Sequence, residues 1–526
     1  HINISKGLIY YFLRNYKESD KNFQLALKLD PRNINALFFY ANSLFDQKIY
    51  IESLSMYKTI YELNPKYKYL MTAYLYNKLI LCEWDGFEKI KKELLLGIEN
   101  FSFTVHSFPI LAVTDKLQLQ VDAAKSLSND QHNQRNKLDK IVKKNASKIN
   151  ASKINIAYFS GDYINHPVSY LIEQLLECHC RENFNVIAIS YGNKVEDKIT
   201  VKIKKVVDLY VDCSSKSDIE IAELSRSLDI HVAINLSGYT ANGRPNIFAY
   251  RAAPIQINFL GYPGSMGVDY MDYIVADHFL IPKESAPYYS EKVIYLPNSF
   301  MPSNNKRQLS ETQLNRIDFS LPEKAIIFCC FNMAYKINPL VMNVWINLLH
   351  KIKNSYLWLN VDNSIAQENL KNYLLKNKID PARVIFAERV EDISVHLKRH
   401  QLADLFLDTF PYNAHTTAND ALYAGLPVIT MSGESFASRV AGSLLQAVGL
   451  PELITHSLEQ YEELAINLAT NQTLLAQITM KLRNNTKSMP LFDSGKYVKN
   501  YEASIQKAYQ NYILNTSAEH IEIDFS

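Results

Sequence analysis

The stretch Asp408-Thr-Phe-Pro-Tyr-Asn-Ala-His-Thr-Thr-Ala-Asn-Asp420, continued by Ala421-Leu-Tyr-Ala-Gly-Leu-Pro-Val-Ile-Thr430, decides the fold. Its pattern predicts a strand end, a polar loop, the start of a helix and then a second strand. The loop contains, in a row, His415, Thr416 and Thr417. Backbone N–H groups at a helix start carry partial positive charge and suit a phosphate, and two hydroxyls add donors. Asp420 follows three residues later and can accept hydrogen bonds from ribose hydroxyls.

An ordinary helix cap is the alternative interpretation of this loop, because Thr and Asp are common at helix starts. A cap alone explains neither the adjacent histidine nor both hydroxyls. Nucleotide binding is therefore the hypothesis that the rest of the sequence has to support.

Short apolar runs alternate with amphipathic segments over most of the chain. From Lys153, strands are predicted at Ile154–Ser160, Asn185–Ser190, Leu209–Val211, Val232–Leu236, Gln256–Phe259 and Tyr273–Ala276, with helices at Ser169–His179, Ser217–Leu228 and Asn246–Tyr250. After a polar stretch at 299–323, strands are predicted at Ala325–Cys330, Tyr356–Asn360, Val384–Ala387, Leu405–Leu407 and Val428–Thr430, with helices at Pro339–Lys351, Gln367–Asn377 and Val395–Gln401. This alternation predicts parallel sheets with helices on both faces. Two such doubly wound domains in tandem bring their strand C-termini to a shared cleft, where ligands bind.

The N-terminal part repeats with an offset of 34 residues. Asn15-Tyr-Lys-Glu-Ser19 corresponds to Ile49-Tyr-Ile-Glu-Ser53, and Leu29-Asp-Pro31 corresponds to Leu63-Asn-Pro65. A 34-residue period with Pro after the second helix is typical of tetratricopeptide repeats, whose helix pairs bury their apolar faces against their neighbours. The chain opens partway into a repeat, so we expect further repeats upstream.

Helical periodicity continues from about 68 to 140 without the repeat, and a polar, partly duplicated stretch at 128–153 is predicted to be a linker. Four regions result. They are repeats at 1–67, a helical connector and linker at 68–152, and doubly wound domains at 153–310 and 311–526.

Composition narrows the class of protein. The chain has 526 residues, of which 47% are hydrophobic and 21% charged, as in a soluble protein of two to four domains. A net charge of +2 gives no electrostatic case for nucleic acid or a membrane surface, and no apolar run is long enough to span a bilayer. Six scattered cysteines predict reduced thiols and a cytoplasmic protein.

Two short motifs resemble functional sites, and we interpret neither of them as one. Cys178-His179-Cys180 could be half of a metal site, but no second pair accompanies it, so a helix-end thiol is favoured. Asn145-Ala-Ser and Asn150-Ala-Ser match glycosylation acceptors, which we interpret as coincidental because no secretory signal is seen.

The His-Thr-Thr loop closely resembles the nucleotide-sugar loop of the O-linked N-acetylglucosamine transferases and their Spindly-type relatives. Other matches follow in the same order over nearly the whole chain. The resemblance implies a GT-B core of two Rossmann-like domains behind tetratricopeptide repeats. It also implies that His415, Thr416, Thr417 and Asp420 bind the donor. The stretch 490–493 and the helix after it, through Tyr501-Glu502, resemble a terminal helix that crosses back onto the first domain.

In the first domain, Gly161-Asp-Tyr-Ile-Asn-His166-Pro resembles the family's His-Pro motif. A histidine at a strand C-terminus can reach a substrate hydroxyl, so His166 is a candidate base, with capping of the next helix as the alternative. Two further segments resemble the walls of the cleft. They supply Gly261 and Pro263 on the donor side, and Tyr239 and Thr240 on the acceptor side.

In the second domain, Lys336 matches the family lysine that contacts the donor's diphosphate, although a solvated helix-start lysine is the alternative. A fixed ammonium there stabilises the charge that the leaving diphosphate gains. His396 and Arg399 share a helical face, and by resemblance His396 packs on the uracil with Arg399 beside it. Two positions depart from the animal enzymes: Met333 replaces a glutamine and Ile393 replaces a lysine that contacts the pyrophosphate.

The activity implied by the resemblance is the transfer of N-acetylglucosamine from UDP to Ser or Thr of proteins, with inversion and without a metal or other cofactor. The repeats would present a groove to acceptor proteins and could support oligomers. The polar stretch at 299–323 is too short for the long insertion of the animal enzymes, which favours a bacterial-type member.

Three alternatives stay open. One is another donor, such as GDP-fucose or a UDP-hexose, although His415 is absent from the fucosyl relatives. A second is an acceptor that is an Asn side chain or a glycan. The third is a catalytically weak scaffold that binds partners through its repeats, and Met333 and Ile393 give it some support.

Overall fold

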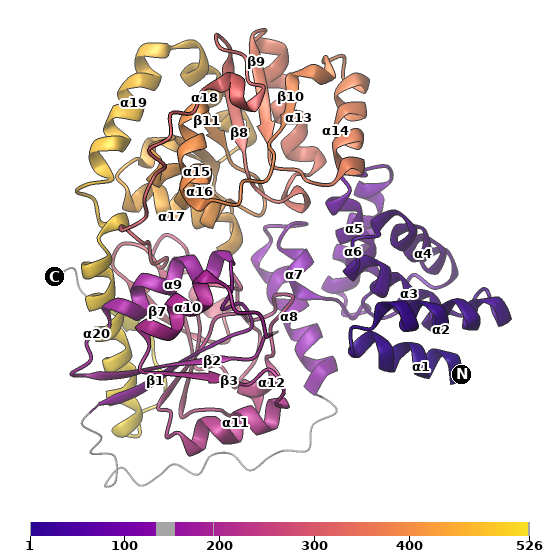
Figure 1. Ribbon diagram of the computed structural model, residues 1–526, viewed down its shortest axis with the longest axis vertical. Coiled ribbons are helices and arrows are strands. Elements are labelled where there is room, and N and C mark those ends of the chain that lie inside the picture. Colours follow the sequence, from indigo (N-terminus) through magenta and orange to yellow (C-terminus); the bar gives the residue numbers. More distant parts are fainter. Residues whose placement is uncertain (1, 133–152, 193, 524–526) are drawn as a thin grey trace.

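The computed structural model describes residues 2–132, 153–192 and 194–523. It contains an N-terminal helical array and two lobes, each built on a parallel sheet (Figure 1). The predicted fold class, two α/β domains behind an all-α region, is confirmed. The motifs at Asn145 and Asn150, and the predicted linker from residue 133 to 152, lie outside the described residues.

The first four helices form two pairs, as the repeat predicts. They are α1 (Ile2–Phe12), α2 (Tyr16–Leu29), α3 (Ile34–Asp46) and α4 (Tyr50–Leu63). One hydrogen bond recurs at the repeat spacing. Ser19 Oγ donates to the Gly7 carbonyl (3.0 Å), and one repeat later Ser53 Oγ donates to the Ala41 carbonyl (2.8 Å). The 34-residue period is therefore a period in packing as well as in sequence.

Four more helices connect the repeats to the lobes. They are α5 (Leu70–Ile80), α6 (Phe87–Glu99), α7 (Ser107–Ile110) and α8 (Leu117–His132). Helix α5 packs against both α4 and α6, so helix stacking continues after the sequence repeat has ended. Helix α8 runs through residues 128–132, which the sequence assigned to the linker. Ser128 in this run is buried and Asn129 is exposed, as expected for a helix with one face against its neighbours.

The first lobe contains an eight-stranded parallel sheet with the order β14-β7-β6-β5-β4-β1-β2-β3. Its strands are β1 (Ile154–Ser160), β2 (Phe184–Ser190), β3 (Leu209–Asp212), β4 (Val232–Asn235), β5 (Ile255–Asn258), β6 (Tyr273–Asp277), β7 (Lys292–Leu296) and β14 (Ile521–Glu522). Its helices are α9 (Pro167–Cys178), α10 (Lys198–Val206), α11 (Asp218–Ser227) and α12 (Asn246–Ala249). Strands β1 and β4 are buried along most or all of their length, which explains their continuous apolar runs.

The second lobe contains a six-stranded parallel sheet with the order β10-β9-β8-β11-β12-β13. Its strands are β8 (Ile326–Cys330), β9 (Ser355–Leu359), β10 (Val384–Phe386), β11 (Leu405–Leu407), β12 (Val428–Met431) and β13 (Ile454–Thr455). Its helices are α13 (Pro339–Lys351), α14 (Ser364–Lys376), α15 (Ile393–Arg399), α16 (Thr416–Tyr423), α17 (Val440–Ala447), α18 (Leu458–Thr470) and α19 (Gln472–Asn485).

The sequence analysis missed several elements, among them the long helices α18 and α19 of the second lobe. Strands β13 and β14 have two residues each, too few to show a periodicity. Strand β7 begins with the exposed Lys292, and α10 is a short, lysine-rich helix. The elements that were predicted agree with the structure to within about three residues at each end, which is the usual uncertainty of a boundary.

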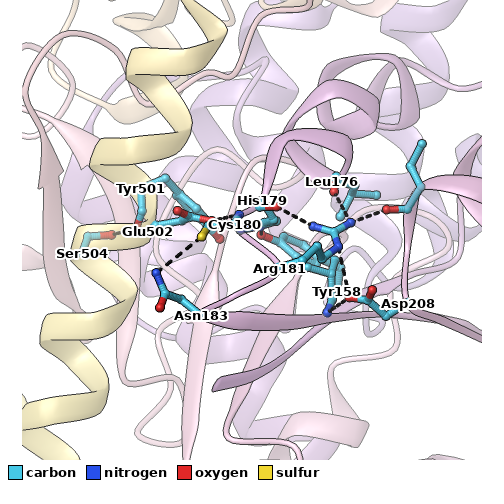
Figure 2. A network of polar contacts seen from close by, with 12 residues as sticks. Tyr158, Leu176, His179, Cys180, Arg181, Asn183, Asp208, Tyr501, Glu502 and Ser504 are labelled. Carbon is cyan, nitrogen blue, oxygen red and sulfur yellow. Dashed lines mark hydrogen bonds and ion pairs between the residues drawn. The ribbon is translucent and has the colours of Figure 1, made fainter. Parts of the chain in front are cut away.

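The last long helix, α20 (Ser494–Ile513), leaves the second lobe and packs on the first, against α9, β5 and β7 (Figure 1). Figure 2 shows the polar contacts that hold it. His179 Nδ1 lies 2.8 Å from Glu502 Oε1, its Nε2 lies 2.7 Å from the Tyr158 hydroxyl, and the Cys180 N–H donates to Glu502 (2.7 Å). Burial lowers the pKa of His179, so its neutral ring donates to Glu502 and accepts from Tyr158. The predicted crossing helix is confirmed, and strand β14 beyond it joins the first sheet.

Within the three described ranges, no helix has both the length and the apolar character that crossing a bilayer requires.

Candidate active site

A cleft of about 1140 Å³ lies between the two lobes and extends to the helical repeats. Loops that follow the C-terminal ends of several strands line it, as expected for doubly wound sheets. The predicted site residues that line this cleft are His166, Tyr239, Thr240, Gly261, Lys336, His396, His415, Thr416, Thr417 and Asp420. The cleft thus brings together ten residues that are far apart in the sequence. Pro263 and Arg399 do not line it.

The buried carboxylate of Asp408 organises the loop between β11 and α16. Its Oδ1 accepts the N–H groups of Thr409 (2.7 Å) and Ala414 (2.5 Å). Its Oδ2 accepts the hydroxyl of Thr430 (2.6 Å). Burial raises the pKa of Asp408, and these hydrogen bonds and the Lys336 ammonium oppose the rise. One carboxylate therefore fixes the shape of the whole loop.

Lys336 reaches across from the crossover after β8 to the same loop. Its Nζ donates to the carbonyl of Asn413 (2.7 Å) and lies 3.7 Å from the centroid of the Tyr412 ring. Burial lowers the pKa of Lys336 to about 7, and the nearby Asp408 opposes this shift. A cation held in a low-dielectric wall acts strongly on an anion in the cleft.

The His-Thr-Thr turn forms the N-terminus of α16, with His415 at the N-cap position. The first N–H groups of a helix have no partner within the helix and point beyond its end, so Thr416 and Thr417 present them at the cleft. The side chain of His415 makes no cap hydrogen bond, which removes the cap-only interpretation for this histidine. Instead its Nε2 lies 3.4 Å from the Ala437 carbonyl, and burial lowers its pKa well below the usual value, so the ring is neutral.

The two threonine hydroxyls of this turn are not equivalent. Thr417 Oγ1 donates to Oδ1 of Asn332, whose own amide donates to Thr409 Oγ1 (2.8 Å). In this conformation the hydroxyl proton of Thr417 is used in the bond to Asn332. The donors that remain for an anion in the cleft are the backbone N–H groups of the turn and the hydroxyl of Thr416. Asn332 thereby joins the turn to the loop that Asp408 fixes.

His396 and Arg399 lie on α15 and have different surroundings. His396 lines the cleft, whereas the Arg399 side chain is buried and lies 4.5 Å from the Phe331 ring. Arg399 Nη2 donates to His396 Nδ1 (2.8 Å), and Nη1 donates to the carbonyl of Glu388 (2.6 Å). Burial, together with neighbouring positive charges, lowers the pKa of His396 to about 2, so the ring is neutral with its proton on Nε2. Arg399 fixes the orientation of His396.

Asp420 lies one helical turn after Thr416 and pairs with an arginine that the sequence analysis did not consider. Arg307 Nη1 donates to Asp420 Oδ1, and Nη2 donates to Asn419 Oδ1 (2.7 Å). Burial raises the pKa of Asp420, and Arg307 opposes the rise. Arg307 also lines the cleft.

His166 is the N-cap residue of α9, and its Nδ1 accepts the N–H of Val168 (3.3 Å). The capping alternative is thus observed, although the residue also lines the cleft. Burial lowers the pKa of His166, and the nearby Asp162 opposes the shift. A neutral ring that accepts at Nδ1 carries its proton on Nε2, so in this conformation it offers a donor. Action as a base requires the capping bond to open.

The backbone of the first lobe approaches the cleft closely at Gly261. A Cβ at this position would lie 2.0 Å from the Leu236 carbonyl oxygen, so only glycine fits. The preceding Leu260 has φ +77°, a left-handed conformation that is costly for leucine, and it also lines the cleft. Beside it, the Tyr239 hydroxyl donates to the Met266 carbonyl (2.9 Å), which orients this ring.

Two further positions on the wall of the cleft are apolar. Met333 and Ile393 both line the cleft, and their side chains are partly exposed. Over the ranges that the structure describes, no three His, Cys, Asp or Glu side chains are grouped to hold a metal ion.

Sequence reasoning missed three residues of this cleft. Asp162 and Arg307 line it, and Asp408 supports it. Asp162 could have been found, because it stands two residues after the end of β1, where cleft residues are expected. Asp408 could also have been found, as a carboxylate directly after β11. Arg307 carried no signal, because it lies in a polar stretch that resembles a domain boundary.

Comparison with known proteins identifies the family to which this chain belongs. The sequence profile of glycosyl transferase family 41 matches residues 126–313 and 311–501, which together exceed half of the chain. The chain belongs to glycosyl transferase family 41. The profile spans both lobes, so most of the cleft is family 41 sequence, and the repeats and the connector helices supply the rest of its lining.

Curated relatives are similar over the same region. A protein of Arabidopsis thaliana named probable UDP-N-acetylglucosamine–peptide N-acetylglucosaminyltransferase SEC is 37% identical over 70% of this chain and 38% of its own length. A tomato protein with the same enzyme name and the designation SPINDLY is 31% identical over 70% of this chain and 40% of its own. The UDP-N-acetylglucosamine–peptide N-acetylglucosaminyltransferase of Caenorhabditis elegans is 27% identical, over 84% of this chain and 49% of its own. This family 41 chain therefore spans less than half of the length of each of these relatives.

A solved structure shares the overall architecture. A mutant of the O-GlcNAc transferase of Thermobaculum terrenum superposes with a TM-score of 0.79 at 22% identity, covering 98% of both chains. At this identity the match shows the fold, with GT-B-like lobes behind helical repeats, over the whole length.

Proposed function

We propose that this family 41 member transfers N-acetylglucosamine from its UDP donor to Ser or Thr hydroxyls of proteins, with inversion of the anomeric carbon and without a metal ion. The observation that carries the proposal is the meeting of the Lys336 ammonium and the N-terminus of α16 in one cleft between the lobes. Both are suited to a diphosphate. The donor sugar and the acceptor class come from the names of the curated relatives.

The chemistry follows from where negative charge develops. The acceptor oxygen forms a bond to the anomeric carbon while the bond to the β-phosphate oxygen breaks, and a single displacement inverts that carbon. The departing UDP gains negative charge. Lys336 and the first N–H groups of α16 stabilise that charge more in the transition state than in the ground state. These groups supply the positive charge that a metal ion supplies in other transferases.

The uridine part of the donor has two matching features in the cleft. The neutral ring of His396, held by Arg399, offers a flat surface on which uracil can stack. Asp420 offers a carboxylate to the ribose hydroxyls, one turn along α16 from the residues proposed for the phosphates. The uracil, the ribose and the diphosphate thus each have a matching protein group in the cleft.

The acceptor enters from the repeat side in this proposal. The repeat residues Tyr11, Asn42, Asp46 and Tyr57 line the same cleft as the donor loop. An extended protein segment that lies along the repeats therefore leads directly to the donor. His166 stays the candidate for proton transfer, on the condition that its bond to Val168 opens.

The test is a transfer assay with the intact chain and a panel of unstructured Ser- and Thr-containing proteins. Each is incubated with UDP-N-acetylglucosamine, UDP-glucose or GDP-fucose, and the intact mass of the acceptor is measured. The proposal predicts a gain of N-acetylhexosamine from the first donor and loss of the gain when the modified Ser or Thr is replaced. A deoxyhexose gain from GDP-fucose alone would contradict the donor, and UDP binding without any transfer would favour the scaffold alternative.

A further inference from the structure

Arg307 lies in the segment between β7 and β8 that joins the two lobes, and its side chain lines the donor part of the cleft. Among the described residues that line this cleft, Lys336 and Arg307 are the two Lys or Arg side chains. A nucleoside diphosphate carries at least two negative charges, so Arg307 is the natural partner for the charge that Lys336 leaves unmatched.

Three hydrogen bonds and one ring contact hold the guanidinium of Arg307 in place. Its Nε donates to the Asn304 carbonyl (3.1 Å), Nη1 donates to Asp420, and Nη2 donates to Asn419 (2.7 Å). The Tyr423 ring lies 4.3 Å from the guanidinium carbon. The Arg307 side chain is 11% exposed and that of Asp420 is 10% exposed. A guanidinium has five N–H groups, and these bonds use three, so two stay available to a ligand.

The charge of Arg307 reaches the other donor-side groups. It contributes to lowering the pKa of His396 and of His400, which places it within electrostatic range of the proposed uracil site. Arginine also keeps its charge at every pH of interest, whereas burial lowers the pKa of Lys336 to about 7. The cleft therefore holds one permanent cation and one whose charge depends on pH.

The spacing on α16 places Arg307 beside the ribose and the first phosphate. Thr416 and Asp420 are four residues apart, so their side chains emerge from one helical face roughly 6 Å apart. A nucleotide with its diphosphate at Thr416 and its ribose hydroxyls at Asp420 spans this distance along the helix. The guanidinium bound to Asp420 then lies at the ribose end of the diphosphate.

We propose that Arg307 is a donor-binding residue that holds the Asp420 carboxylate toward the ribose hydroxyls and sets its own charge against the nucleotide's diphosphate. This inference rests on the proposed function, because it assumes a uridine diphosphate in the cleft. It assigns to the segment between the lobes a part in donor recognition, in addition to its part in joining them.

A purely structural role for Arg307 is the competing explanation. The segment around it is well connected: Asn419 donates to Ser303 Oγ (2.5 Å), the Tyr423 hydroxyl donates to the Arg307 carbonyl (2.5 Å), and Lys306 pairs with Glu177 (3.0 Å). A structural arginine would change stability, and R307K, which keeps the charge that balances Asp420, would then bind uridine and UDP as wild type does. A donor-binding arginine discriminates between ligands with and without phosphates.

The test is isothermal titration of uridine, UMP and UDP into the intact chain, comparing wild type with R307M, R307K and K306M. Lys306 is a matched control, because it is the sequence neighbour of Arg307 and carries an exposed charge that pairs with Glu177. We expect R307M to weaken UDP binding about 10- to 100-fold. The loss of uridine binding should be several-fold smaller than this, so the ratio of UDP affinity to uridine affinity falls. R307K keeps the charge and loses the paired bonds, so its ratio stays near wild type while uridine binding weakens. K306M should match wild type for all three ligands.

An R307M ratio within twofold of wild type would overturn the charge part of the inference. Unchanged uridine affinity in R307K would overturn the ribose part, and this variant also decides the question should R307M fail to fold. A wild type that binds no UDP would instead overturn the proposed function itself, and this inference with it.

Discussion

The side of the cleft proposed to bind the donor and the side proposed to bind the acceptor are built differently. On the donor side, Asp408, Asn332, Thr417 and Asn413 form a connected set of hydrogen bonds that includes Lys336. On the repeat side, the polar groups that line the cleft make local contacts between neighbouring helices: Tyr11 with Asp46 (2.9 Å), and Tyr57 with Asn42 (2.6 Å).

Under the proposed function, this difference separates the way in which the two substrates are recognised. A connected network fixes its donors before the nucleotide arrives, which is how electrostatic stabilisation becomes large. A stack of repeats presents local pairs that act independently, so each contributes modestly and many acceptors can be accommodated. Changes on the donor side should therefore have large, shared effects, and changes on the repeat side small, separate ones.

The largest effect is expected at Lys336. In K336M the diphosphate loses its nearest cation, and turnover should fall about 100- to 1,000-fold, the range seen when one transition-state donor is removed. Steady-state rates of donor turnover with saturating acceptor measure this, and circular dichroism confirms folding. Turnover within fivefold of wild type in a folded K336M protein would show that Lys336 takes no part in the mechanism. It would also contradict the expected difference between the donor side and the repeat side.

A second prediction concerns the wall of the first lobe at Gly261. In G261A the new methyl group would lie 2.0 Å from the Leu236 carbonyl, so the backbone must move, and we expect about 1–3 kcal/mol of lost stability and weaker UDP binding. G264A is the matched control, because a Cβ there meets only the Tyr262 ring at ordinary contact distance, 3.5 Å. Thermal unfolding and titration of UDP compare them. Equal stability of the two variants would show that this wall is not rigid.

The pH dependence of nucleotide binding tests the charge of Lys336. The pKa of Lys336 in the folded protein is lowered to about 7, so its ammonium is present below that pH and lost as pH rises. Binding a diphosphate favours the ammonium, and UDP affinity should therefore fall between pH 7 and 9, by up to about tenfold per pH unit. Titrations across this window should show the slope in wild type and a flatter curve in K336M. A UDP affinity that rises over this window would contradict the assignment.

The smallest effect is expected on the repeat side, at Asp46. This exposed carboxylate lines the cleft and accepts the Tyr11 hydroxyl. In D46N we expect the KM for acceptors with basic residues near the modified hydroxyl to rise about two- to fivefold, as for a partly exposed charge contact. Acidic acceptors serve as the control, and UDP affinity should be unchanged. A loss of UDP affinity in D46N would show that the two sides of the cleft are coupled.

Much of the fold could be predicted from the sequence, because its signals are local. The 34-residue offset gave the repeats, and the apolar runs gave the buried central strands β1 and β4. The turn proposed for donor binding was singled out because a helix start, two threonines and a carboxylate stand within six residues of one another. Residues 128–132 were predicted both as helical and as the start of the linker, and they form the last turns of α8.

The rest of the site depends on contacts between distant residues. Arg307 meets Asp420 across 113 positions of sequence, and no local pattern marks either residue for the other. Arg399 shares a helical face with His396, but spacing alone could not tell that one is buried while the other faces the cleft. Likewise, sequence placed Pro263 in the cleft, whereas only the preceding Leu260 and Gly261 reach it.

The central claim is that a uridine diphosphate binds between the lobes, with its phosphates at the His-Thr-Thr turn and Lys336. A crystal structure of the chain with UDP tests this most directly. We predict phosphate oxygens within hydrogen-bonding distance of the Thr416 and Thr417 backbone N–H groups and of Lys336 Nζ, with the uracil on His396. A diphosphate bound elsewhere, with this turn and Lys336 untouched, would contradict the account.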